Sequence, residues 1–301
     1  MSMSPSYKPI VAIAGLNGTL GQQTLAALLS HQFINCFHLP IRVLTRDPSN
    51  IGGEYVYTAD MAQYLRADYN DPEVLDAALE NVDVVINLLG MYPTSWIQLG
   101  EAAYRIGAKL YIPSEFGPDY RCFNYDSPFA LKQVQSERAR NDGIKTVQIF
   151  CGIFMDHAIP AGGHLGIDLQ GGRVTAVAQP GSEPRVSFTC VRDVAMTIAS
   201  VACRRPSTLP DAFRIAGDTW TLRQLAEYYQ SITGATVHVT TQDYSAFSAW
   251  VLHGGDQNIG GHYQLAAGAG FLDYSNNSSN EWANAGMWQW RSIQQHLFSG
   301  N

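Results

Sequence analysis

Three glycines separated by two residues each, Gly15, Gly18 and Gly21, carry the clearest chemical signal in this sequence. They follow a short apolar run, residues 10–14, and precede a helical pattern that starts at Thr19. This order of strand, glycine turn and helix points the first helical N–H groups at a pyrophosphate. The spacing G-x-x-G-x-x-G also fits an ordinary tight turn, but its place in the chain favours a dinucleotide site. The predicted contacts are Gly15, Asn17, Gly18, Thr19, Leu20 and Gly21.

Two charged residues follow the second predicted strand, residues 41–45, and bear on which dinucleotide binds. An acidic residue at this position accepts the ribose 2′-hydroxyl of NAD, whereas an arginine pairs with the 2′-phosphate of NADP. Arg46 favours NADPH, and the hydroxyl of Thr45 can contact the same phosphate. Asp47 leaves NAD open, and a solvated surface pair is the alternative for both charges.

The elements that position these residues are strands and helices that alternate as far as residue 150. Alternation of this kind predicts an α/β fold with a Rossmann-type, doubly wound parallel sheet. We expect residues 1–155 to form the NAD(P)-binding domain. Residues 156–301 are expected to form a smaller, irregular substrate-binding part over the carboxyl edge of the sheet, where ligands bind. The predicted strands are residues 10–14, 41–45, 63–67, 82–89, 109–113 and 146–150, and the later helices are residues 129–141, 191–203, 222–233 and 287–298, with a loop-rich stretch at 257–280.

Composition excludes several classes of function. The chain has 301 residues, is 46% hydrophobic and has a net charge of −7, without a Lys/Arg cluster, which argues against nucleic-acid binding. No apolar run approaches the roughly 20 residues of a membrane helix, and the first residues lack a signal-peptide pattern. The five cysteines include no C-x-x-C pair, and the eight histidines show no metal-ligand spacing. These features predict a cytoplasmic protein with reduced thiols and no metal.

Several stretches, in this order, resemble one known family. They are GLNGTLG at 15–21, VLTRDP at 43–48, VDVVINLLG at 82–90, IPSEFGPD at 112–119 and FALKQVQSERARNDGIKTVQI at 129–149. The chain resembles the isoflavone reductase-like branch of the NmrA-like proteins, which are atypical short-chain dehydrogenases. The resemblance is strong to about residue 155 and loose thereafter. It implies a Rossmann-type fold, NADPH as cofactor, and reduction of a small, often aromatic substrate.

The resemblance also implies that Lys132 is the catalytic lysine. A standard short-chain dehydrogenase has a tyrosine four residues before its lysine, but Pro128 stands there in this chain. Phe116, Phe129 and Phe154 are expected to desolvate the lysine, lowering its pKa so that it exchanges a proton near neutral pH. A solvated surface lysine is the alternative interpretation.

The remaining site residues are predicted from their places at the strand ends. For the apolar ones, ordinary packing is the alternative interpretation. His157 or His164 could replace the missing tyrosine as proton donor, although a lone histidine is more often structural. The expected cofactor neighbours are Leu89, Gly90, Met91, Pro113, Ser114, Phe116 and Lys132, and the expected substrate contacts are Met91, Tyr92, Phe154, Met155 and His157.

These features together predict an NADPH-dependent reductase that transfers hydride to a small aromatic or polycyclic secondary metabolite, with Lys132 as general acid or base. Two alternatives stay open. One is an isomerase that binds NADP(H) without net redox chemistry, and the other is an NADP-sensing regulator that binds a protein partner. Lys132 favours the enzymes, since a sensor needs no lysine there. A homodimer is also possible.

Overall fold

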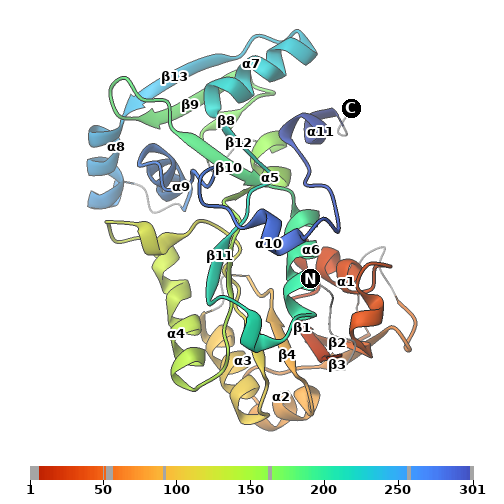
Figure 1. Cartoon of the computed structure of the whole chain (residues 1–301). Coiled ribbons are helices and arrows are strands. Elements are labelled where there is room, and N and C mark those ends of the chain that lie inside the picture. The colour runs from red at the N-terminus through yellow and green to blue at the C-terminus, as the bar shows by residue number, and fades with distance from the viewer. Residues whose placement is uncertain are drawn as a thin grey trace.

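The nucleotide-binding half is built around one parallel sheet (Figure 1). The computed structural model describes residues 7–49, 51, 57–90, 93–161, 165–255 and 259–298. The five strands lie in the order β3-β2-β1-β4-β5, and every pair is parallel. Strand order reverses between β1 and its neighbour β4, which places a ligand crevice at their carboxyl ends. The strands are β1 (Ile10–Ala14), β2 (His38–Thr45), β3 (Ala62–Arg66), β4 (Val84–Asn87) and β5 (Leu110–Ile112).

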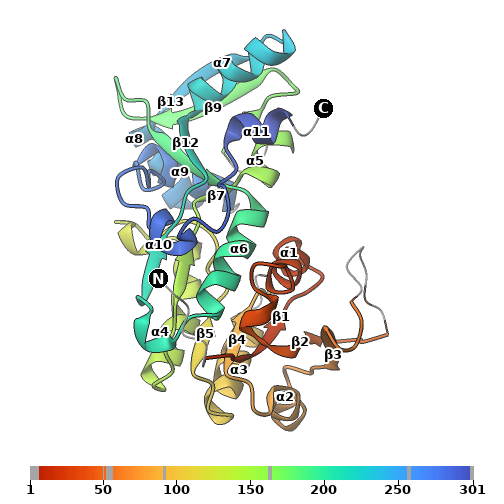
Figure 2. The same cartoon turned by 45° about the vertical axis from the view of Figure 1, so that its right-hand side comes forward.

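Helices cover both faces of this sheet, and the alternation of side chains along β1 shows how. Val11 and Ile13 face one core, which they share with α1 and α6, while Ala12 and Ala14 face the core shared with α2 and α3. Figure 2 shows these two groups of helices on opposite sides of the strands. The doubly wound fold predicted from the sequence is therefore confirmed. The helices are α1 (Thr19–Leu28), α2 (Pro72–Leu79), α3 (Pro93–Arg105), α4 (Gln133–Asn141) and α6 (Val191–Ala202).

Helix α6 belongs to the second half of the chain but completes the first core. Every residue of α6 except Arg192 is buried, and the helix lies side by side with α1 (Figures 1 and 2). Strand β6 (Gln148–Phe150) likewise pairs with the later β11 (Ala212–Arg214). The chain just before β6 meets β5 through a parallel bridge between Tyr111 and Thr146, but among the described residues β6 itself is paired with β11 and not with the five-stranded sheet. The domain boundary at residue 155 stays a prediction.

The rest of the second half forms two small three-stranded sheets with a core of their own, in the upper part of Figure 1. Thr221 caps α7 in a capping box. The strands are β7 (Ile153–Phe154), β8 (Ile167–Asp168), β9 (Arg173–Ala178), β10 (Arg185–Thr189), β12 (Asp218–Thr221) and β13 (His238–Asp243). The helices are α5 (Met155–Ala161), α7 (Leu222–Thr233), α8 (Tyr244–Trp250), α9 (Ile259–Gly268), α10 (Asn280–Asn284) and α11 (Ile293–Phe298), with shorter helical turns at Ile34–Cys36, Tyr120–Cys122, Pro128–Lys132, Pro206–Thr208 and Val251–Gly255.

Two sequence predictions about the second half are wrong. The stretch expected to be loop-rich contains α9, and the last glycine of this helix serves close packing, since a Cβ on Gly268 would lie 2.8 Å from the Val177 carbonyl oxygen. The last helix begins at Ile293 and not at residue 287. The Asn284 side chain bonds both the N–H and the carbonyl of Trp288, which closes a turn where the helix was expected.

A buried carboxylate, Asp119, ties the two halves together. Its side chain is fully buried and lies 2.8 Å from the guanidinium groups of both Arg121 and Arg214, the latter from β11. Its main-chain N–H donates to the hydroxyl of Tyr274 at 2.8 Å. Burial alone raises the pKa of Asp119, but the hydrogen bonds and charges of the two arginines outweigh it and hold the pKa below its ordinary value.

We therefore expect Asp119→Asn to lower the free energy of unfolding at pH 7 by about 2–3 kcal/mol. Because its pKa is depressed, the carboxylate stabilises fully at neutral pH, and this contribution is lost as the pH falls through the folded-state pKa. Urea denaturation at pH 7 and at acid pH measures both effects. The matched control is Glu183→Gln, which breaks an exposed pair with Arg223 and is expected to cost less than about 1 kcal/mol.

No helix among the described residues has the length and apolar character needed to cross a membrane.

Candidate functional site

The glycine turn connects β1 to α1, and two of its three glycines are required by the protein itself. Gly15 has φ +100°, and a Cβ there would lie 2.5 Å from the carbonyl oxygen of Leu88. A Cβ on Gly21 would lie 2.2 Å from the Gly15 carbonyl oxygen, so only glycine lets the helix approach the strand this closely. Gly15 therefore permits the sharp turn, and Gly21 permits the close packing of α1.

Gly18 differs, because no close contact with another protein atom requires a glycine at this position. Its backbone is extended (φ −78°, ψ 160°), and a Cβ would meet nothing closer than the Gly15 carbonyl oxygen at 3.5 Å. Asn17, Gly18 and Thr19 are exposed, and no side chain caps α1 or places an acid in its first turn. The bare N-terminus fits a phosphate. The side chain of Leu20 is buried in the core, so only its backbone can take part.

At the end of β2, the structure separates the roles of Arg46 and Asp47. One carboxylate oxygen of Asp47 accepts from both the N–H and the hydroxyl of Ser49, at 3.0 and 2.6 Å. These hydrogen bonds lower the pKa of Asp47 and hold its carboxylate in its own turn. The hydroxyl of Thr45 is also within that turn, bonded to the Asp47 backbone. Arg46 is exposed and makes no hydrogen bond or ion pair with the described residues, which suits it to a 2′-phosphate.

A buried amide network shapes the chain just after β4. The Asn87 side chain donates to the Tyr111 hydroxyl at 2.9 Å and to the Gln135 carbonyl at 3.0 Å, and its own oxygen accepts the N–H of Leu89. The hydroxyl of Ser114 donates to the Leu89 carbonyl at 2.7 Å. Ser114 therefore positions the segment that leads to Gly90 at the crevice. Met91 and Tyr92, predicted as contacts, lie outside the described residues.

Lys132 stands at the junction of two helical types, since residues 128–132 form a 3-10 turn and α4 starts at Gln133. The Ser127 hydroxyl caps this turn by accepting the N–H of Phe129. The Lys132 Nζ donates to the main-chain oxygen of Glu115 at 2.9 Å. Burial of the ammonium group lowers the pKa of Lys132, although the nearby Glu115 opposes the shift. The Lys132 side chain is thus partly buried, and its Nζ is held by a main-chain oxygen.

The buried Glu115 side chain lies close enough to Lys132 for the two charges to interact. Its Oε1 accepts from the Ser136 hydroxyl at 2.6 Å, and from Tyr120 and Gln148 at 3.0 Å each. Its Oε2 is buried and has no hydrogen-bond partner in the part of the chain that the structure describes. Burial raises the pKa of Glu115, against the opposing charge of Lys132. The sequence motif contained this acid, but no role was predicted for it.

A cavity of about 150 Å³ opens beside Phe116 at the start of the second half. It brings together Phe116, Phe154 and His157, as predicted. Tyr263 of α9 was missed because its segment was expected to be loop, and burial raises the pKa of its phenol. The fully buried Met155 belongs to the second core and does not line the cavity. The lining residues are Phe116, Gly152, Ile153, Phe154, His157, Ala158 and Tyr263.

The two histidines considered as proton donors are not equally placed. His157 is exposed at the cavity and packs edge-on against Phe154, with ring centroids 5.9 Å apart. His164 lies outside the described residues. Phe129, expected near the lysine, is buried behind the cavity, with its ring 4.7 Å from that of Tyr263.

The comparison with known families agrees with this geometry. Residues 7–272 match the NmrA-like family, which covers the glycine turn, Lys132 and the cavity. This chain belongs to the NmrA-like family. The resemblance predicted from the sequence is thus confirmed.

Sequence identity to individual proteins is low or covers only part of the chain. Phenylcoumaran benzylic ether reductase TP7 from Nicotiana tabacum is 36% identical over 108 residues, which span 32% of this chain and 33% of that protein. A crystal structure of isoflavone reductase superposes with a TM-score of 0.75 at 18% identity, covering 98% of this chain and 100% of that one. The structure of AtPrR2 with NADP+ and (+)pinoresinol also has a TM-score of 0.75, at 19% identity, covering 97% and 98%. These structures establish the fold.

Proposed function

We propose that this NmrA-like protein is an NADPH-dependent reductase of a small aromatic substrate, with Lys132 as the general acid. The observation that carries the proposal is the desolvated lysine at the same sheet edge as a glycine turn with an uncapped helix. The names of the similar proteins, two reductases and a structure with NADP+, support it. A cytoplasmic location and a homodimer stay predictions.

The cofactor would be held along the crevice. The turn around Gly18 would bind the pyrophosphate and Arg46 the 2′-phosphate. Leu89 and Gly90 would lie under the nicotinamide ribose, and the residues after β5 would border the ring. When bound, NADPH supplies the hydride that reduces the substrate. The residues after β5 are Pro113, Ser114 and Phe116.

The protein's own contribution to the chemistry is a proton and a dry site. Lys132 would donate a proton from Nζ to the substrate atom that gains negative charge. Its lowered pKa brings proton donation closer to neutral pH. Phe116 and Phe154 would exclude water from the cavity, whose volume of about 150 Å³ suits one aromatic ring. His157 at the rim would contact the rest of the substrate.

The cofactor assignment is tested by Arg46→Ala. Loss of a charge-assisted contact to the 2′-phosphate is expected to weaken NADPH binding about 10- to 100-fold, with little change for NADH. A fluorescence titration with each nucleotide measures this. Asp47→Ala is the matched control and should leave NADH binding unchanged, because the Asp47 carboxylate is engaged by Ser49. Weaker NADH binding in Asp47→Ala would instead indicate an NAD site.

Turnover with a panel of aromatic ethers, lignans and quinones tests the reaction class. A reductase consumes one NADPH for each product formed. An isomerase would form product with no net NADPH oxidation, and a regulator would bind NADPH without converting any substrate.

A further inference from the structure

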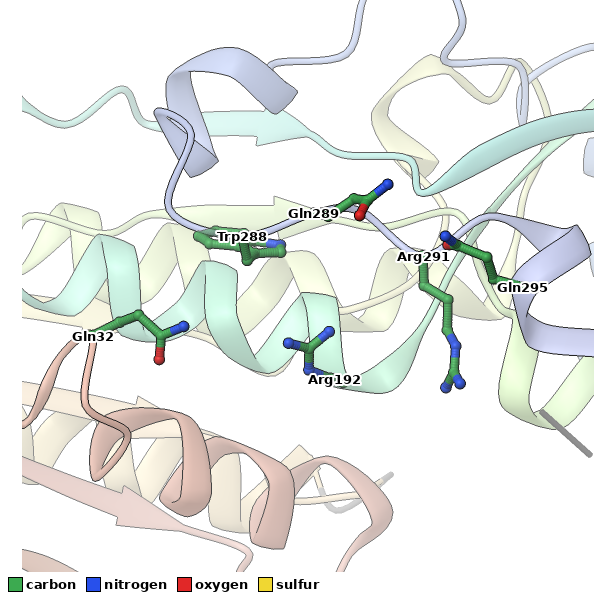
Figure 3. A pocket seen from close by; sticks show the side chains of 6 residues that line it. All are labelled: Gln32, Arg192, Trp288, Gln289, Arg291 and Gln295. Atoms are coloured by element: carbon green, nitrogen blue, oxygen red, sulfur yellow. The ribbon is translucent and has the colours of Figure 1, made fainter.

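A groove of about 580 Å³ lies along α6 (Figure 3), and none of its described lining residues also lines the cavity beside Phe116. Its walls come from the loop after α1, the first turn of α6, the chain between α10 and α11, and the first turn of α11. No acidic side chain is among its described lining residues, although the protein has a net charge of −7. We call it the α6 groove, and its lining residues are Gln32, Arg192, Trp288, Gln289, Arg291 and Gln295.

Two arginines from different elements line this groove. Figure 3 shows the side chains of Arg192 and Arg291 in the space between α1 and the C-terminal segment. The Arg192 guanidinium is half-exposed, and its distance to the Asp193 carboxylate is 3.9 Å, longer than a hydrogen bond. The main-chain N–H of Arg291 is fixed by Asp193 at 2.7 Å. Helix α6 and the segment before α11 thus each contribute a positive charge to the lining of the groove.

The nearby carboxylates each accept a main-chain N–H in the protein interior, and the second oxygen of Asp193, Oδ1, is buried with no hydrogen-bond partner among the described residues. Asp156 accepts the N–H of Val191 at 2.7 Å and so caps α6, which means that the helix end itself is not the available site. Asp193 is fully buried beneath the groove, and burial raises its pKa to about 6. Neither carboxylate lines the groove.

Trp288 provides a second, independent observation. Its side chain is only 8% exposed, and its indole Nε1–H has no hydrogen-bond acceptor among the described residues. Figure 3 shows the nitrogen edge of the ring turned along the groove toward the side of the two arginines. Buried donors without an acceptor are rare, and an oxygen-rich ligand would supply one.

We propose that the α6 groove binds a phosphate-bearing small molecule, with the phosphate between Arg192 and Arg291. Guanidinium groups bind phosphate through paired hydrogen bonds, and two of them with an indole N–H offer more donors than the two oxygens of a carboxylate accept. The side-chain amides of Gln32 and Gln289 can bind the rest of the ligand. The groove volume lies in the range of small-molecule sites.

The test is a 31P NMR titration with inorganic phosphate, with and without saturating NADPH. Saturable binding is expected in both cases, since the cofactor would fill the glycine turn and not the groove. Arg192→Gln and Arg291→Gln are each expected to weaken phosphate binding about tenfold or more. Arg192→Lys, which keeps the charge, should recover part of the affinity. Arg223→Gln, at an exposed arginine of α7, is the matched control and should bind like the parent protein.

Three results would overturn the proposal. They are no saturable binding, equal binding in the groove variants and the parent protein (an adventitious ion only), or loss of binding in Gly18→Ala, which would place the phosphate in the glycine turn. Circular dichroism shows whether each variant is folded. The exposed Arg192 allows the test even if Arg291→Gln unfolds. Because one arm contains no NADPH, failure of the reductase proposal leaves this result interpretable.

Discussion

Replacement of Lys132 by alanine is expected to lower kcat about 10²- to 10⁴-fold, while NADPH affinity changes little. The reason is geometric and electrostatic. The Lys132 Nζ is fixed by the Glu115 carbonyl at 2.9 Å, and burial lowers its pKa. Removing a positioned acid raises the barrier of the step that uses it and leaves cofactor contacts elsewhere intact. Stopped-flow measurement of NADPH oxidation, once a substrate is found, separates kcat from binding.

The pH profile shows whether Lys132 acts as the acid. A protonated lysine is required, so the rate is expected to fall as pH rises through a pKa below the ordinary lysine value. Glu115→Gln removes a negative charge that raises the Lys132 pKa, and should move this alkaline limb to lower pH. Lys109→Ala, at an exposed lysine paired with Asp83, is the control. An unchanged limb in Glu115→Gln, or parental turnover by Lys132→Ala, would contradict the assignment.

In the glycine turn, alanine substitutions at Gly18 and Gly21 are expected to have opposite effects on folding and on NADPH binding. Gly18→Ala is expected to fold normally, since its Cβ meets no protein atom within 3.4 Å, but to weaken NADPH binding about 100-fold by blocking the phosphate. Gly21→Ala is expected to unfold the protein, because its Cβ would lie 2.2 Å from the Gly15 carbonyl oxygen. Thermal denaturation and nucleotide titration of both variants distinguish a ligand-driven glycine from a packing-driven one.

The opposite pattern would be equally informative. If Gly18→Ala binds NADPH like the parent protein, the cofactor does not approach this turn closely, and the proposed crevice is wrong. If Gly21→Ala folds, the close contact of α1 with the turn is more adaptable than the distances indicate.

Local signals predicted the first half of the fold well. The apolar run at residues 10–14 and the glycine turn each depend on residues that are close in the sequence, and both form as expected. Where the structure depends on contacts between residues far apart in the sequence, local patterns could not predict it. Residues 146–150 read as a sixth sheet strand, but β6 pairs with a strand more than 60 residues away. Helix α9 forms in a glycine-rich stretch because its alanines and Leu265 are buried.

The site divides in the same way. Gly18, Arg46 and Lys132 each belong to a short motif, so their roles could be proposed from the sequence, and those roles stay predictions. The amide network of Asn87 could not, because its partner Gln135 is 48 residues away, although a single amide in an otherwise apolar strand was a usable signal. Tyr263 and the α6 groove come together only when the end of the chain folds back over the beginning.

That return of the chain has a consequence for how the protein is made. The apolar side of α1 is covered by α6, whose residues leave the ribosome more than 160 positions later. At about 5–20 residues per second, the interval is roughly 10 to 30 s, during which α1 has no permanent partner on that side. The nascent chain is therefore expected to need a chaperone until Ala202 has emerged.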